Sequence, residues 1–224
     1  MSLKTLDTTK LFYDTYKYRL VIQHNLGIIF RDKNLVNART VLDSLQLQAE
    51  TEEEIVWKRS IRYSVPVTRE SLITAQFLLA EFTNQGHDNY KLRCEHPFLN
   101  IYSNDLAWMD LLMDKNLSIE SFSRPDINSI NDLKPNIIVT NDNPIEFEYK
   151  VTVGNQVSAG LAQWILANQD KCRAGQKFID LVANNGYVNG MYFYVRDEKV
   201  LQLVQLIIGG NIRRIDKFIN SALS

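Results

Sequence analysis

The alternation of apolar and polar residues is clearest over the stretch 145–153, where the odd-numbered positions are Ile, Phe, Tyr, Val and Val. Side chains two apart on a strand point to the same face, so these apolar residues would share one face and Glu146, Glu148 and Lys150 the other. A β-branched run at 137–140 comes before this stretch, separated from it by a turn-forming sequence. The pattern therefore predicts a β-hairpin.

The apolar period changes after Gly154. Val157, Leu161, Trp164 and Ile165 recur at helical spacing, which predicts a helix directly after the hairpin. The stretch as a whole would then have the order strand, turn, strand, helix.

The same order is expected elsewhere in the chain. Residues 16–22 and 28–31 form a candidate hairpin before a helix that starts near Leu35, and 90–95 with 98–102 form another before a helix at 106–115. A strand at 191–195 leads into a helix at 199–208. We therefore expect an α/β (α+β) fold, with strand-hairpin-helix units on a mixed or largely antiparallel sheet.

The last part of the chain has a different pattern. Val200–Ile208 is apolar nearly all round, which predicts a buried element, and Gly209 and Gly210 would end it. After them Ile212, Ile215, Phe218 and Ile219 recur at helical spacing, so a short helix is expected at 212–219.

One polar, turn-rich stretch, 123–132, is the best candidate for a boundary within the chain. We expect residues 1–224 to form a single compact domain, or two subdomains, 1–122 and 133–224, joined by this stretch.

Composition narrows the function only slightly. The formal net charge is -1 and the isoelectric point is near 6.3, so binding to nucleic acid would need a local basic patch. Residues 1–20 lack the apolar core of a signal peptide and no run is long enough to span a bilayer, so a cytoplasmic protein with no membrane partner is expected. Cys94 and Cys172 lack the spacing of a zinc site or a disulfide framework, and no phosphate-binding glycine loop is present.

Glu148-Tyr149-Lys150 resembles the central hairpin of the PD-(D/E)xK nuclease superfamily, and the resemblance covers roughly the C-terminal half of the chain. It implies that Glu148 and Lys150 are catalytic, with Glu148 binding Mg²⁺ and Lys150 orienting the attacking water. Alternating Glu and Lys is also typical of the solvent face of an ordinary strand, and both interpretations stay open.

The sequence departs from that family at the first acidic residue, which normally follows a proline. Here Asn136 follows Pro135, and an amide carries no negative charge to a metal. Asp126, which follows Pro125, and Asp142, in the predicted turn, are the candidates for the missing ligand. Glu146 would be a further ligand or would support the others.

A second hypothesis is nucleic-acid binding without catalysis, to DNA or RNA. Aromatic and basic residues are interleaved in several predicted strands, as in 16–19, 90–93 and 192–196, and on an open sheet they could stack on bases and hold phosphates. The candidate basic contacts are Lys17, Arg19, Lys91, Arg93, Lys171, Arg173, Lys177, Arg213 and Arg214. Lys171, Arg173 and Lys177 are expected on the outer side of a helix at 171–184.

A third hypothesis is a structural or assembly protein that acts through protein–protein contacts or as a homo-oligomer. The segment 186–209 resembles uncharacterised phage proteins, which fits a viral origin but implies no activity.

Overall fold

The computed structural model describes residues 3–51, 54–60, 63–115, 117–142, 144–155 and 157–220. The chain divides into two compact units, which are described separately here. Unit 1 comprises Met1–Thr8 and Thr15–Pro125, and unit 2 comprises Thr9–Asp14 and Asp126–Ser224. The change of unit after Pro125 lies within the polar stretch 123–132. No feature of the sequence predicts that Thr9–Asp14 belongs with the C-terminal part.

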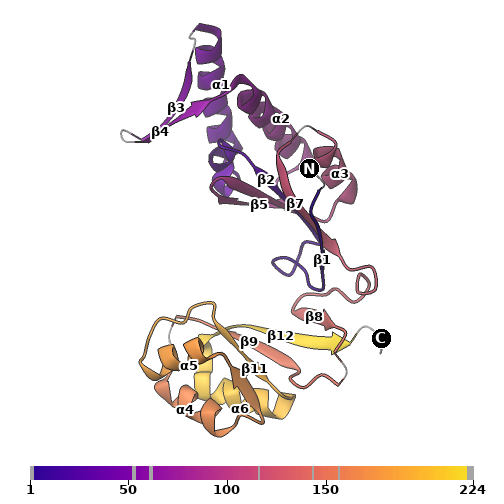
Figure 1. Ribbon diagram of the computed structural model, residues 1–224, viewed down its shortest axis with the longest axis vertical. Helices are drawn as coiled ribbons and strands as arrows, with labels where there is room; N and C mark the ends of the chain where they lie inside the picture. The colour runs from indigo at the N-terminus through magenta and orange to yellow at the C-terminus, as the bar shows by residue number, and fades with distance from the viewer. Residues whose placement is uncertain are drawn as a thin grey trace. The chain divides into compact units, whose positions relative to one another are not determined.

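Unit 1 is built on a five-stranded sheet with the strand order β1-β7-β2-β6-β5, in which β1 and β7 are parallel and the other neighbours antiparallel. Its elements are β1 (Thr5–Thr8), β2 (Tyr18–Gln23), the 3-10 helix η1 (Gly27–Lys33), α1 (Leu35–Thr51), β3 (Ile55–Ser60), β4 (Tyr63–Val67), α2 (Arg69–Gln85), β5 (Tyr90–Glu95), β6 (Phe98–Ser103), α3 (Leu106–Met113) and β7 (Ile119–Pro125). Strands β3 and β4 form a separate two-stranded ribbon (Figure 1).

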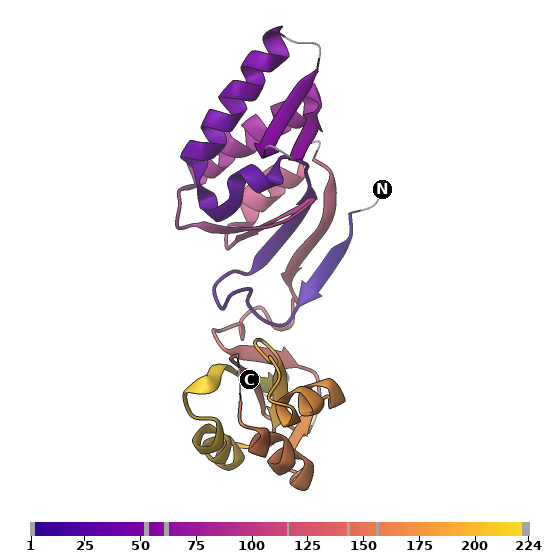
Figure 2. The same ribbon diagram turned by 90° about the vertical axis from the view of Figure 1, so that its left-hand side faces the viewer.

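The core of unit 1 lies between its sheet and the helices α1, α2 and α3 (Figure 2). Phe82 of α2 is fully buried, and its ring centroid lies 5.1 Å from that of Phe30 and 5.3 Å from that of Tyr90. Helix α2 begins where its sequence indicates, because the Thr68 side chain accepts a hydrogen bond from the Ser71 backbone N–H.

The predicted hairpin at 90–95 and 98–102 is confirmed as β5 and β6. The predicted hairpin at 16–22 and 28–31 is wrong, because residues 28–31 lie in η1 and β2 pairs with β6 and β7 instead. Ile29 and Phe30 are adjacent and both buried in one core. A strand would direct them to opposite faces, whereas a helical turn allows both to be buried together.

His24 of unit 1 is buried, and burial lowers its pKa below the usual 6.5, while the nearby Ser71 backbone has a smaller opposing effect. The unfolded chain therefore binds a proton more readily than the folded one. The contribution of neutral His24 to the free energy of unfolding is complete above about pH 6.5. It is lost as the pH falls from there toward the pKa of His24 in the folded protein. Urea unfolding measured between pH 7.5 and about 5 should show the free energy of unfolding decreasing with falling pH in the wild type and in His87→Gln, an exposed control. The slope should be weaker in His24→Gln, and an unchanged slope there would contradict the assignment.

Unit 2 is built on a mixed five-stranded sheet with the order β10-β11-β9-β12-β8, in which only the β12–β8 pair is parallel among the described residues. Its elements are β8 (Ile137–Thr140), β9 (Tyr149–Val153), α4 (Ala159–Ala167), β10 (Cys172–Ala174), α5 (Gln176–Ala183), β11 (Tyr192–Val195), α6 (Glu198–Ile208), the 3-10 helix η2 (Gly209–Asn211) and β12 (Ile212–Asn220). The two mixed sheets with their helices confirm the expected α/β (α+β) class.

Four predictions for this unit are wrong. Residues 212–219 form a strand, not a helix, and this strand lies between β8 and β9, so the predicted hairpin at 137–153 does not exist. The predicted helix at 171–184 begins only at Gln176, after the short strand β10. Helix α6 is not buried all round, since Leu206 is 82% exposed.

The described α-helices of unit 2, α4, α5 and α6, pack on one face of its sheet (Figures 1 and 2). Val151 of β9 and Phe193 of β11 are fully buried against them. No described helix of unit 2 lies on the opposite face of this sheet. Nor does any described helix have the length and apolar character needed to cross a membrane.

Candidate nucleic-acid interface

The helix-free face of the unit 2 sheet collects polar and aromatic side chains. In register across the sheet, Lys150 of β9 lies between Tyr194 of β11 and Asp216 of β12. Partners in register share a face, and the next residue along each strand points into the helix-covered core. We define the helix-free face by Glu148, Lys150, Thr152, Arg173, Tyr192, Tyr194, Arg214, Asp216 and Phe218.

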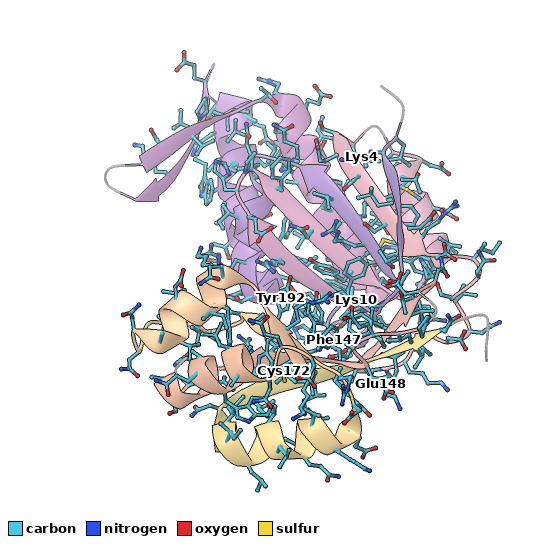
Figure 3. All side chains as sticks on the ribbon, turned by 60° about the horizontal axis from the view of Figure 1, so that its bottom comes forward. Lys4, Lys10, Phe147, Glu148, Cys172 and Tyr192 are labelled. Atoms are coloured by element: carbon cyan, nitrogen blue, oxygen red, sulfur yellow. The ribbon has the colours of Figure 1, made fainter. Side chains whose placement is uncertain are left out.

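A row of aromatic rings crosses this face. The ring centroids of Tyr192 and Tyr194 lie 5.6 Å apart, and those of Tyr194 and Phe218 lie 6.0 Å apart. Tyr192, labelled in Figure 3, is 44% exposed, and the other two are half-buried. Burial raises the pKa of Tyr194, and its neighbour Tyr192 adds to the effect. Tyr194 is therefore neutral at physiological pH.

Lys150 lies against this row. Its Nζ atom is 3.8 Å from the centroid of the Tyr192 ring, which is cation–π geometry. Burial lowers the pKa of Lys150, the nearby Lys10 and Arg214 lower it further, and Asp216 opposes them. A bound anion would relieve the repulsion among these cations.

A partly buried ion cluster lies beside Lys150. Arg214 Nε donates to Asp216 Oδ1 at 2.6 Å, and Arg214 Nη2 donates to Asp14 Oδ1 at 2.5 Å. Asp216 is only 3% exposed. Asp14 also accepts from the backbone N–H of Asn136 at 3.1 Å, so the cluster ties the segment Thr9–Asp14 to β12 and to the start of β8. Arg214, a predicted nucleic-acid contact, is thus engaged by two carboxylates.

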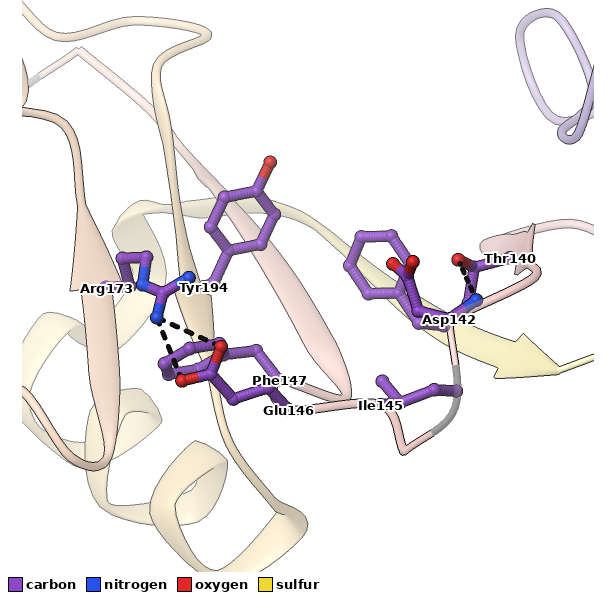
Figure 4. A pocket seen from close by; sticks show the side chains of 8 residues that line it. Thr140, Asp142, Ile145, Glu146, Phe147, Arg173 and Tyr194 are labelled. Atoms are coloured by element: carbon purple, nitrogen blue, oxygen red, sulfur yellow. Dashed lines mark hydrogen bonds and ion pairs between the residues drawn. The ribbon is translucent and has the colours of Figure 1, made fainter.

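A pocket of about 260 Å³ opens next to the aromatic row, lined by Thr140, Asp142, Ile145, Glu146, Phe147, Arg173, Tyr194 and Phe218. Arg173 Nη2 donates to the two carboxylate oxygens of Glu146 at 2.8 and 3.0 Å, and its guanidinium lies 4.7 Å from the centroid of Phe147. Figure 4 shows this ion pair beside the Tyr194 ring, with Asp142 on the other side of the pocket.

The four carboxylates predicted to bind a metal have separate surroundings. Glu146 pairs with Arg173, Asp142 lines the far side of the pocket, Glu148 is half-buried just before β9, and Asp126 accepts from the Asn128 backbone N–H in a turn. Among the described residues no three His, Cys, Asp or Glu side chains are grouped so that they could hold a metal ion. The magnesium site stays a prediction. Asn143, in the predicted turn, lies outside the described residues.

The predicted basic contacts are divided between the units. Lys17, Arg19, Lys91 and Arg93 belong to unit 1, where Arg19 and Lys91 flank Tyr102 in register on the face of the sheet opposite its helices. Lys171, Arg173, Lys177, Arg213 and Arg214 belong to unit 2. Lys171 Nζ donates to Asn168 Oδ1 at 3.0 Å and Arg213 Nη1 to Asn189 Oδ1 at 3.2 Å, while Lys177 lines a second pocket. Of these residues, Arg173 and Arg214 lie on the helix-free face.

Sequence reasoning missed Asp216 and Phe218 because it assigned 212–219 to a helix, and it missed Asp14 because nothing local indicated that Thr9–Asp14 belongs to unit 2. No local signal for a strand was available, because Arg214-Ile215-Asp216-Lys217-Phe218 does not alternate strictly between polar and apolar residues.

Comparison of the chain with protein-family models, with curated proteins and with solved structures found no match.

Proposed function

We propose that unit 2 binds single-stranded nucleic acid on the helix-free face of its sheet. The observation that carries the proposal is the row of three rings, Tyr192, Tyr194 and Phe218, beside Lys150 on a face without a helix. Aromatic side chains on an open sheet stack with bases whatever their sequence, and neighbouring cations hold the phosphates. The bases of a duplex are stacked on one another, so a single strand fits such a row better.

The local charge permits binding although the whole chain is slightly acidic. Arg214 is neutralised by Asp14 and Asp216, and Arg173 pairs with Glu146, which leaves Lys150, at the Tyr192 ring, and the nearby Lys10 to contact phosphates. Each phosphate contact to a single strand contributes about -0.7 to the slope of log K against log salt. Two such contacts predict a slope of about -1.4.

Tyr192→Ala should weaken the binding of a fluorescent single-stranded oligonucleotide by about 1–3 kcal/mol, the usual contribution of one stacked base. The matched control is Tyr187→Ala, which removes a tyrosine that is 67% exposed and precedes β11. Fluorescence anisotropy titrations measure both affinities. Equal affinities for the two variants and the wild type would contradict the proposal.

Lys150→Gln should reduce the salt slope by about 0.7, whereas Lys199→Gln, an exposed lysine on α6 at the opposite side of the sheet, should leave it unchanged. Titrations with single-stranded DNA, single-stranded RNA and duplex DNA at several salt concentrations measure the slope. If none of them binds, the protein–protein assembly hypothesis becomes the better one, and light scattering would test it.

Metal-dependent cleavage is a second candidate function. One arrangement favours it: Glu148 and Lys150 share the helix-free face, and the buried carboxylate of Asp216 lies in register with Lys150. In this proposal Glu148 binds Mg²⁺ and Lys150 orients water. End-labelled DNA or RNA should be cut with Mn²⁺ but not with EDTA, and both Glu148→Gln and Lys150→Gln should abolish cutting. Cutting that persists in either variant would refute these roles.

A further inference from the structure

A second pocket of unit 2 lies at the β10–β11 edge of the sheet and has a volume of about 530 Å³, which is in the usual range for small-ligand sites. We propose that this pocket accepts one nucleobase of the single strand bound to the helix-free face. The inference rests on the proposed function and assigns a specific ligand group to a specific cavity.

The walls of the pocket suit a flat heteroaromatic ring. Phe178 of α5, Met191 and the ring of Tyr192 supply apolar and polarisable surface. Ala174, Gly175 and Gly190 also line the pocket and have little or no side chain, which leaves space. A β-carbon built on Gly175 or Gly190 would meet no atom within 4 Å.

The charge around the pocket favours a nucleotide over a cationic ligand. Arg173 and Lys177 line it, and none of the described lining residues is Asp or Glu. The first pocket differs, since Asp142 and Glu146 line it. A base in the second pocket would place a flanking phosphate near Lys177, whose charge complements it, and near Arg173, which already pairs with Glu146.

The pocket is also continuous with the proposed binding face. Tyr192 and Tyr194 belong both to the aromatic row and to the pocket lining. Arg173 lies in register with Tyr194, and both residues line the two pockets. A single-stranded nucleic acid whose bases stack on the aromatic row can therefore place a further base in the pocket while it stays on the sheet.

Filling the pocket tests the inference. Gly175 has φ −71°, which a leucine can adopt, so Gly175→Leu should fold normally and occupy the cavity. Gly210→Leu is the matched control, because a β-carbon there also meets nothing within 4 Å and Gly210 lies beyond the end of α6. Both variants are titrated with a single strand of about ten nucleotides and with an abasic strand of the same length.

Gly175→Leu should bind the base-bearing strand about tenfold more weakly than the wild type and the abasic strand equally well, while Gly210→Leu matches the wild type with both. If Gly175→Leu binds the base-bearing strand like the wild type while Lys150→Gln still reduces the salt slope, the pocket is not used and the binding face stands. An equal loss for both strands would also overturn the inference, because the effect would not depend on a base. If the wild type binds neither strand, the proposed function itself fails.

Discussion

Replacing Arg214 by methionine is expected to destabilise unit 2 by about 3 kcal/mol. The change removes the partner of Asp216, which would remain as a buried carboxylate at 3% exposure, and it also removes the contact to Asp14. Loss of one member of a buried ion pair typically costs about 3–5 kcal/mol. The lower end of this range applies to Arg214→Met, because Lys150 lies in register with Asp216 and its positive charge still offsets part of the carboxylate charge.

Hydrogen exchange under native conditions measures this effect separately in each unit. Amides of β9 and β12 should lose protection in Arg214→Met, and those of β6 in unit 1 should keep it. Arg213→Met is the control, because Arg213 is the exposed neighbour of Arg214 and its described side-chain hydrogen bond is to Asn189. Amide protection in Arg213→Met should match that of the wild type in both units.

The double variant Arg214→Met, Asp216→Leu separates a missing charge partner from a packing defect. Replacing a whole buried ion pair by apolar residues is often neutral, because the desolvation cost of both charges disappears. The double variant should therefore recover most of the lost protection. If it is less stable than Arg214→Met, the destabilisation comes from packing and the charge argument is wrong.

Local sequence signals were sufficient for most of the helices. Thr68 accepts from the Ser71 N–H at the start of α2, and Asp105 accepts from the Trp108 N–H at the start of α3. Such caps act over three residues, so they are visible in the sequence. The β5–β6 hairpin was predicted for the same reason, since its two strands are neighbours in the chain.

Strand β12 could not be recognised because a β-bulge mimics a helical period. The register shifts between Ile212 and Arg214, so Ile212 pairs with Val153 and Ile215 with Val151. Both isoleucines thereby reach the same core although they are three residues apart. The spacing of three residues between Ile212 and Ile215, followed by Phe218 and Ile219, is typical of a helix and therefore predicted one.

The position of β12 could not be predicted either. Residues 137–140 and 145–153 are close in sequence, so direct pairing was the natural expectation. The structure instead inserts the last described strand of the chain between them. Pairing over such a distance leaves no local signal. The aromatic row could not be predicted for the same reason. Tyr192 and Tyr194 were recognisable in the sequence, but Phe218 lies beside them only because β12 is inserted into the sheet.

Ending the chain after Asn211 should therefore unfold unit 2. The truncation removes β12, which is the only neighbour of β8 in the described sheet and one of the two neighbours of β9. It also removes Arg214 and leaves Asp14 without its cation. A domain is stable by only about 5–15 kcal/mol, and the loss of a central strand exceeds that margin.

Hydrogen exchange should then show loss of protection in β9 and β11 and native protection in β6 of unit 1. A chain that ends after Asn220 retains all of β12 and is the matched control. A short peripheral helix at 212–219, as the apolar spacing predicted, would have a smaller effect, because β8 and β9 could still pair as a hairpin. Retained protection in β9 would therefore refute the central position of β12, and with it the register that places Asp216 and Phe218 on the proposed binding face.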